Sequence, residues 1–278
     1  MAQKTTKIAA IQMATGPNVS ANLLETERLL AEAAEGGAGL VVLPENFAFM
    51  GKRDQDQVSL READGEGPLQ EFLSQMARKY GIWLVGGTIP LTAHDASKVR
   101  AACLLFDDRG ERVARYDKIH LFDVHLLEAD ERYVESATIE PGDQVVVVDS
   151  PFGRLGLAVC YDIRFPELFR AMQDQGVEVL AVPSSFTAIT GKAHWEVLVR
   201  ARAIENLAYV IAAAQGGYHI NGRETHGHSM IVDPWGTVLA QVPRGNGTVS
   251  SNLDRDYQAT VRRTFPTLQH RRLKCAKA

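Results

Sequence analysis

Short apolar runs alternate with longer amphipathic segments along most of this 278-residue chain. The runs are rich in Val, Ile and Ala with little polar alternation, which is typical of strands buried on both faces. The longer segments have helical spacing of apolar positions. The predicted strands are Ile8–Met13, Leu40–Leu43, Ile82–Thr88, Ala101–Phe106, Val145–Val148, Leu155–Tyr161, Val177–Val182, Tyr209–Ala214 and Ser229–Val232. The predicted helices are Asn18–Glu35, Pro68–Tyr80, Pro166–Gln175 and Ala193–Glu205.

The same alternation of strands and helices continues through both halves of the chain. Turn signals such as Pro141-Gly142-Asp143 recur at short intervals, and no stretch has the composition of a domain linker. We therefore expect a single layered α/β domain over residues 1–278, with sheets sandwiched between helices. Its core is predicted over about residues 7–255, followed by a C-terminal tail over about 256–278.

Composition and charge exclude several classes of protein. The chain is 45% hydrophobic and 23% charged with a net charge of −4, which is ordinary for a globular protein and gives no nucleic-acid footprint. No run of about 18 apolar residues is present, so no membrane partner is expected. We interpret the basic cluster near the end as a solvated terminus. Its members are Arg262, Arg263, Arg271, Arg272 and Lys274.

The cysteines and the N-terminal stretch bear on location. Three cysteines, an odd number, do not make a disulfide framework, so a reducing compartment fits better. The apolar stretch that begins at Ile8 is interrupted by Gln12 and is too short and too polar for a secretory signal. We expect a soluble, cytoplasmic protein.

Cys160 is the first candidate for chemistry. It closes a predicted strand and is followed by a segment with Pro166 in the first turn of a predicted helix. Backbone N–H groups at such a turn favour a thiolate and can bind an oxyanion. A free cysteine is more often a small buried apolar side chain, so both interpretations stay open on this pattern. Cys103 lies inside a predicted strand and is assigned to the core, while Cys275 lies on the polar tail.

Glu45 and Lys118 are candidates to assist a thiol. Glu45 follows a buried predicted strand and Pro44, and a carboxylate at such an edge suits general acid–base work. Lys118 lies in a segment of aromatic and mixed-charge residues, where an ammonium can face the negative charge developing on a carbonyl oxygen. Taken singly, either residue could equally be a solvated surface charge.

Three segments taken together resemble the nitrilase superfamily of carbon–nitrogen hydrolases. They are Leu43-Pro44-Glu45-Asn46, Asp117-Lys118-Ile119-His120-Leu121-Phe122-Asp123 and Gly156-Leu157-Ala158-Val159-Cys160-Tyr161-Asp162. The resemblance runs over nearly the whole chain. It implies an α/β fold of the nitrilase type, a four-layer α-β-β-α sandwich that often dimerises, so we expect a homodimer without a cofactor.

The resemblance also implies roles. Cys160 would attack an amide carbon, and Glu45 would carry protons to the leaving amine and from water. Lys118 and the backbone N–H of Tyr161 would hold the tetrahedral oxyanion. Glu135 matches a second glutamate that orients the lysine and the substrate. Two other acids compete for that last role, namely Glu128 and Glu131.

Residues after the nucleophile are similar to the Nit amidase branch rather than to true nitrilases. This branch hydrolyses amides that carry an α-keto carboxylate, and the pattern Gly227-His228-Ser229-Met230 favours deaminated glutathione, cleaved to 2-oxoglutarate and cysteinylglycine. The alternatives are α-ketoglutaramate, the substrate of an ω-amidase, and a related small amide or carbamoyl compound.

The predicted substrate-binding residues are Arg164, which follows Cys160 by four residues and supplies a cation beside it, and Phe186 and Thr190, which match branch positions that line the pocket. Arg164 can bind the α-keto carboxylate bidentately, although a surface salt bridge to Glu167 is the alternative. The small-molecule amide is the expected partner. Gly216 and Gly217 are predicted to leave space on the leaving-group side.

Three other functions remain as rivals. His226-Gly227-His228, with Asp123 and His125, could suggest a metal-dependent hydrolase, but no His-Glu-x-x-His motif or cysteine pair supports a metal site. A non-enzymatic binding protein on the same scaffold would not need the three candidate residues intact. Acyl transfer from a thioester to an amine could also compete with hydrolysis.

Overall fold

The computed structural model describes residues 6–126 and 131–273. Its α-helices are α1 (Val19–Glu35), α2 (Pro68–Tyr80), α3 (Pro166–Asp174), α4 (Ala188–Asn206) and α5 (Arg255–Thr264). Three short 3₁₀ helices are η1 (Asp54–Leu60), η2 (Glu135–Ala137) and η3 (Cys160–Arg164).

Two large sheets and one hairpin contain the strands. The first sheet has the order β15-β1-β2-β3-β5-β4, with β6 also paired to β5. Its strands are β1 (Lys7–Gln12), β2 (Leu40–Val42), β3 (Trp83–Val85), β4 (Ile89–Thr92), β5 (Val99–Phe106), β6 (Arg112–Asp117) and β15 (Gly247–Asn252). The second sheet has the order β14-β13-β12-β11-β10-β9. Its strands are β9 (Val147–Ser150), β10 (Gly153–Leu157), β11 (Val179–Ala181), β12 (Tyr209–Ala212), β13 (Ser229–Val232) and β14 (Val238–Val242). The hairpin pairs β7 (Asp123–Leu126) with β8 (Glu131–Val134).

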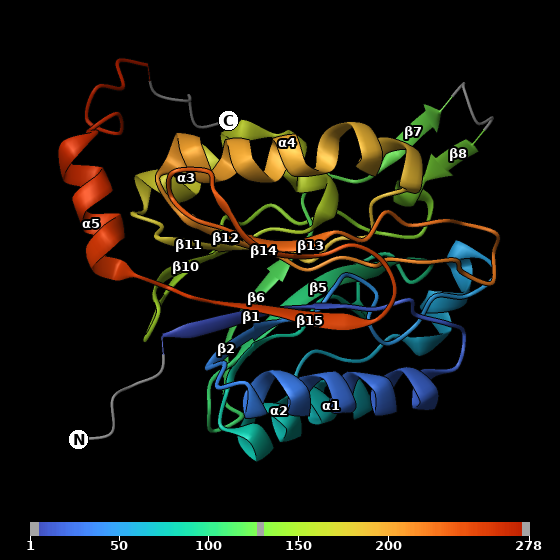
Figure 1. The fold of residues 1–278 in the computed structure, drawn as a ribbon. Coiled ribbons are helices and arrows are strands. Elements are labelled where there is room, and N and C mark those ends of the chain that lie inside the picture. Colours follow the sequence, from blue (N-terminus) through green and yellow to red (C-terminus); the bar gives the residue numbers. More distant parts are fainter. Residues whose placement is uncertain (1–5, 127–130, 274–278) are drawn as a thin grey trace.

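These elements form four layers. Helices α3 and α4 cover the outer face of the second sheet, the two sheets pack face to face, and α1 and α2 cover the outer face of the first sheet (Figure 1). This arrangement confirms the predicted α-β-β-α sandwich. The two-faced burial of the strands explains their lack of polar alternation.

Strand β1 shows how one strand serves two cores. Ile8 and Ala10 pack into the core between the sheets, whereas Ala9 and Ile11 pack toward α1 and α2. Successive side chains of a strand point to opposite faces, so one apolar run supplies both layers.

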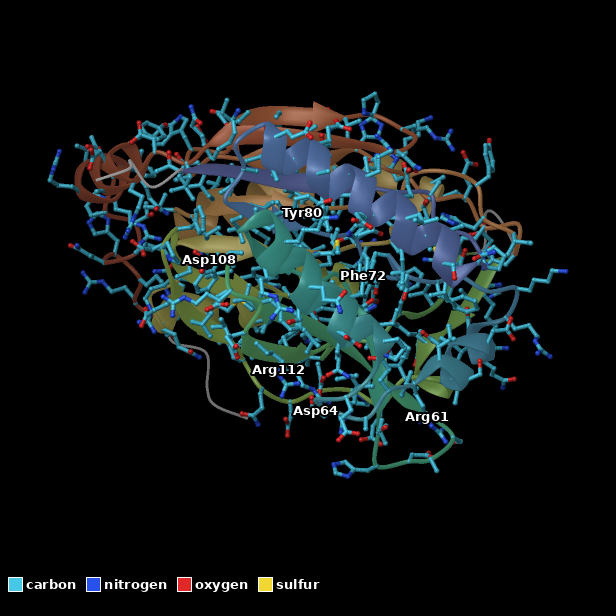
Figure 2. The ribbon with its side chains drawn as sticks, turned by 90° about the horizontal axis from the view of Figure 1, so that it is seen from below. Arg61, Asp64, Phe72, Tyr80, Asp108 and Arg112 are labelled. Carbon is cyan, nitrogen blue, oxygen red and sulfur yellow. The ribbon has the colours of Figure 1, made fainter. Side chains whose placement is uncertain are left out.

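Figure 2 shows, from below, the helical layer formed by α1 and α2. There α1 and α2 run side by side across the sheet, and α2 carries the labelled Phe72 and Tyr80. Both side chains are partly buried against the core beneath these helices. Near one edge of the layer, Asp64 pairs with Arg112 of β6.

Several predicted boundaries were wrong for local reasons. The predicted strand Leu155–Tyr161 ends at Leu157, and Cys160, within the predicted range, has a φ of 49°, which a strand does not allow. Helix α4 begins five residues before the prediction, at Ala188, since the Thr187 side chain accepts the N–H of Thr190 as an N-cap.

Several other strands were not predicted. Strands β6 and β15 lack an apolar run and were not predicted, but β15 pairs antiparallel with β1 from Lys7↔Asn252 to Gln12↔Gly247. Strands β4, β7, β8 and β14 were also not predicted.

The predicted C-terminal tail contains a packed helix, α5. Arg262 of this helix donates to the carbonyl oxygens of Leu207 and Val177, and Arg271 pairs with Asp174. The interpretation of these two arginines as a solvated terminus was therefore wrong. Lys274 and Cys275 lie outside the described residues. Within the described ranges, no helix combines the length and the apolar character needed to cross a bilayer.

Candidate active site

Three predicted residues meet at the ends of strands. Glu45 follows β2, Lys118 comes directly after β6, and Cys160 lies three residues beyond β10. Lys118 Nζ is 2.8 Å from Glu45 Oε1, and both side chains are buried. All three side chains line one cleft, in which Cys160 is 7% exposed. The structure thus brings together residues that are as much as 115 positions apart in the sequence.

Glu135 completes a carboxylate–ammonium–carboxylate arrangement. Its two oxygens lie 2.7 and 2.9 Å from Lys118 Nζ, and one of them accepts the Phe122 N–H at 2.6 Å. The competing Glu131 instead accepts the Tyr133 hydroxyl, and Glu128 lies outside the described residues. Glu135 is therefore the acid that the fold places against the lysine.

The charges of this group depend on one another. Burial by itself would lower the pKa of Lys118, but the negative charges of Glu135 and Glu45 outweigh burial and raise the pKa well above its ordinary value. Burial also raises the pKa of Glu135, although Lys118 opposes that shift. The lysine is therefore charged and can serve as a fixed hydrogen-bond donor.

The Cys160 thiol is held in a strained turn. Its φ of 49° is in the left-handed region, its N–H donates to the Pro183 carbonyl at 2.8 Å, and the Ser185 N–H lies 3.4 Å from Sγ. Burial and the charge of Glu45 raise the pKa of the thiol. The Ser185 N–H opposes this rise in pKa, as expected of a backbone donor at the turn, but burial and Glu45 outweigh it, so the thiol needs a base.

A buried aspartate that the sequence did not reveal as important fixes this turn. Asp162 has no exposed surface, and its carboxylate accepts the Val159 N–H at 2.8 Å and the Tyr116 hydroxyl at 2.7 Å. It also accepts the His120 N–H at 3.0 Å and lies 2.7 Å from Nδ1 of that ring. One carboxylate thereby ties the nucleophile turn to the segment after Lys118.

The three predicted substrate-binding residues line one cleft with the catalytic candidates. This cleft encloses about 710 Å³, including space open to solvent. The Arg164 guanidinium lies 5.0 Å from the Phe186 ring centre, 5.7 Å from the Tyr161 ring centre and within 3.1 Å of His194 Nδ1. It forms no salt bridge with Glu167 or with any other acid in the described ranges. Thr190 contacts Thr187 at the start of α4.

The family assignment rests on nearly the full chain. The family described as Carbon-nitrogen hydrolase matches residues 7–263. This chain belongs to the carbon-nitrogen hydrolase family.

Individual relatives agree with this assignment. The deaminated glutathione amidase of Yersinia enterocolitica is 42% identical over 97% of this chain and 94% of its own length. Nit3 of Saccharomyces cerevisiae, a solved member of the nitrilase superfamily, superposes with a TM-score of 0.87 at 30% identity, covering 98% of each chain. A solved amidase variant from Nesterenkonia sp. AN1, with acrylamide added to its active-site cysteine, has a TM-score of 0.78 at 28% identity, covering 95% of this chain and 99% of that one.

In this carbon-nitrogen hydrolase, the predicted role of the loop glycines is not supported. Neither Gly216 nor Gly217 lines the cleft. A Cβ at Gly216 would come within 2.8 Å of Gln12, and one at Gly217 would come equally close to Ala14. These glycines permit close packing of the backbone rather than opening space for a leaving group.

The same loop contributes a cleft residue that sequence reasoning missed. Arg223 lines the cleft of this carbon-nitrogen hydrolase, as do Tyr133 and Ser185. Its only sequence signal was an arginine in a polar loop, which is ordinary for a surface. The histidines of the metal hypothesis, His226 and His228, stack on each other with ring centres 4.4 Å apart. No group of three or more metal-binding side chains occurs within the described ranges.

Proposed function

We propose that this carbon-nitrogen hydrolase cleaves an amide through a thioester on Cys160. The observation that carries the proposal is the buried Lys118 ammonium, held between Glu45 and Glu135 in the cleft that contains the thiol. An ammonium has three N–H donors. When one N–H bonds to Glu45 and a second is shared by the two oxygens of Glu135, the third is left for an oxyanion.

The first half-reaction forms the acyl-enzyme. Glu45 takes the proton of Cys160, whose raised pKa makes a base necessary, and Sγ bonds to the amide carbon. Lys118 and the Tyr161 N–H stabilise the oxyanion. When this intermediate collapses, the C–N bond breaks and Glu45 returns the proton to the leaving amine.

The second half-reaction releases the acid. Water attacks the thioester as Glu45 accepts one of its protons, and the oxyanion again faces Lys118. The C–S bond then breaks and the proton passes to the sulfur, which restores the thiol. Glu135 keeps Lys118 in position through both half-reactions.

We further propose deaminated glutathione as the substrate, cleaved to 2-oxoglutarate and cysteinylglycine. Arg164 lines the cleft beside Cys160, and burial lowers the pKa of its guanidinium because burial opposes an unpaired charge. A substrate carboxylate would relieve that cost. The name of the Yersinia enterocolitica relative supports the same substrate.

The test compares kcat/KM for deaminated glutathione and for α-ketoglutaramate with the purified protein. A preference for deaminated glutathione is expected. A preference for α-ketoglutaramate would make the protein an ω-amidase and refute the proposed substrate. Hydrolysis of both by a Cys160→Ala variant would refute the thioester.

We also propose that the protein acts in the cytoplasm as a homodimer. Cys103 and Cys160 are both free thiols, which suits a reducing compartment. Val197 and Ile204 on the outer side of α4 are 68% and 45% exposed, an apolar surface that a second copy could cover. Light scattering that gives the mass of one chain would refute the dimer.

A further inference from the structure

A second cation lies in the catalytic cleft. Arg223 donates from Nη2 to the Ser185 carbonyl at 2.7 Å, and its guanidinium lies 5.0 Å from the centre of the Tyr133 ring. Its Nε is buried and has no hydrogen-bond partner. Asp54, an exposed acid that lines the same cleft, forms no ion pair with it. Arg223 is therefore held by neutral groups and retains donor capacity.

Ser185 connects this cation to the nucleophile. Its N–H lies 3.4 Å from Cys160 Sγ, and its carbonyl accepts from Arg223. Its side chain is 1% exposed, and Oγ has no hydrogen-bond partner. A buried hydroxyl without a partner is costly in a folded protein. Like the Nε of Arg223, this hydroxyl is a buried polar atom for which the described residues supply no partner.

A row of aromatic rings extends between the two arginines of the cleft. Arg164 lies over Tyr161, whose ring centre is 5.1 Å from that of Phe122. Phe122 in turn lies 5.1 Å from Tyr133, over which Arg223 is placed. The two guanidinium groups therefore flank opposite ends of one aromatic row.

The cleft continues beyond Arg223. An adjoining hollow of about 370 Å³ shares Asn46, Asp54, Gln57 and Arg223 with the main cleft, and Asn221 and Arg53 also line it. A leaving group larger than ammonia thus has space on this side.

The reach of the proposed leaving group matches the position of Arg223. Ser185 N lies 3.4 Å from Cys160 Sγ, and Ser185 O lies 2.7 Å from Arg223 Nη2. Because the N and O atoms of one residue are at most about 3.5 Å apart, Nη2 lies within about 10 Å of Sγ. An extended dipeptide spans about 7 Å, and a hydrogen bond adds about 3 Å. A dipeptide amine attached to the reacting carbonyl can therefore bring its terminal carboxylate to this guanidinium.

We propose that Arg223 binds the terminal carboxylate of the substrate's amine portion, while Arg164 binds the carboxylate of the acyl portion. This assignment rests on the proposed function. It makes the enzyme selective for amides that carry an anionic group at both ends. α-Ketoglutaramate, whose leaving group is ammonia, has no group for Arg223 to bind.

The experiment measures kcat and KM of the parental protein, Arg223→Met and a control, Arg244→Met. Arg244 pairs with Glu224 and lies over Tyr218, outside the residues that line the cleft. The three substrates are deaminated glutathione, its analogue with a C-terminal carboxamide, and α-ketoglutaramate. The last two substrates lack the carboxylate in question but keep the acyl portion.

Arg223→Met is expected to lower kcat/KM for deaminated glutathione by about 10- to 100-fold, mainly through KM, as for a lost charged hydrogen bond. Its kcat/KM for the other two substrates should fall by a much smaller factor, because the lost bond to the Ser185 carbonyl affects all three substrates alike, and their turnover also shows that the variant is folded. The parental protein should prefer deaminated glutathione over its carboxamide analogue. Arg244→Met should show the same preference as the parental protein.

Equal losses on all three substrates would overturn the assignment, because Arg223 would then serve the acyl portion or the fold. Equal parental activity on carboxylate and carboxamide would overturn it as well. Both results leave the proposed function standing. Failure of the parental protein to hydrolyse deaminated glutathione would refute the proposed function and this assignment together.

Discussion

Replacing Asp162 with asparagine tests whether this buried carboxylate positions the nucleophile. The substitution keeps the size of the side chain but exchanges one acceptor oxygen for an NH₂ donor. One carboxylate oxygen accepts the His120 N–H, and the other accepts the Val159 N–H. Either orientation of the amide therefore turns an NH₂ group toward a backbone N–H. The Tyr116 hydroxyl can rotate, but a backbone donor cannot.

The expected magnitude follows from that geometry. One orphaned buried donor costs about 1–3 kcal/mol, and bonds to a charged acceptor are the stronger kind, so we expect a loss of about 2–4 kcal/mol in unfolding free energy. Because Cys160 is held at a φ of 49° two residues away, its sulfur should also shift. A misplacement of about 1 Å can lower kcat on the order of 100-fold.

The assays are urea unfolding and steady-state kinetics with Tyr116→Phe as a matched control. That control removes one donor to Asp162 and leaves the two backbone bonds intact. Tyr116→Phe should lose less unfolding free energy than Asp162→Asn and should keep nearly the parental kcat. For Asp162→Asn, kcat should fall while KM changes little, as expected of a positioning residue. A parental kcat in Asp162→Asn would show that the carboxylate does not position Cys160.

Three further predictions concern the remaining titratable groups. Cys160→Ala should abolish turnover, whereas Cys103→Ala, in the fully buried core, should lower stability more than rate; the reverse pattern would exchange their roles. Lys118→Met should lower kcat by on the order of 10²–10³, since a lost oxyanion donor costs about 3–4 kcal/mol, and Glu45→Gln should lower it by on the order of 10² or more. Near-parental rates would contradict these roles. Burial lowers the pKa of His226 from 6.5 to about 4. The neutral imidazole therefore stabilises the folded protein above pH 6.5, and this contribution to the unfolding free energy is lost as the pH falls toward 4. His226→Gln should weaken the pH dependence of the urea midpoint in this window, and an unchanged profile would refute the assignment.

Elements with a strong local signal could be predicted from the sequence alone. The strand predicted at Ile8–Met13 is observed as Lys7–Gln12, and the helix at Pro68–Tyr80 has the predicted bounds. Burial on both faces selects continuous apolar runs, and a proline in the first turn marks a helix start. Strand β15 and helix α5 have no such signal. The conformation of β15 depends on its pairing with β1, and that of α5 depends on its packing against the end of the second sheet.

The catalytic candidates were visible in the sequence because each of Glu45, Lys118 and Cys160 stands in its own recognisable segment. What those side chains contact was decided by the tertiary structure. Arg223 looked like a loop residue, but in the cleft it donates to the Ser185 carbonyl, 38 residues earlier, and lies over the Tyr133 ring. Asp162 accepts from the nearby Val159, but it ties two segments together only through donors more than 40 residues away. Local sequence patterns record burial and backbone preference, whereas a hydrogen bond between distant segments leaves no local pattern, so only the folded chain reveals it.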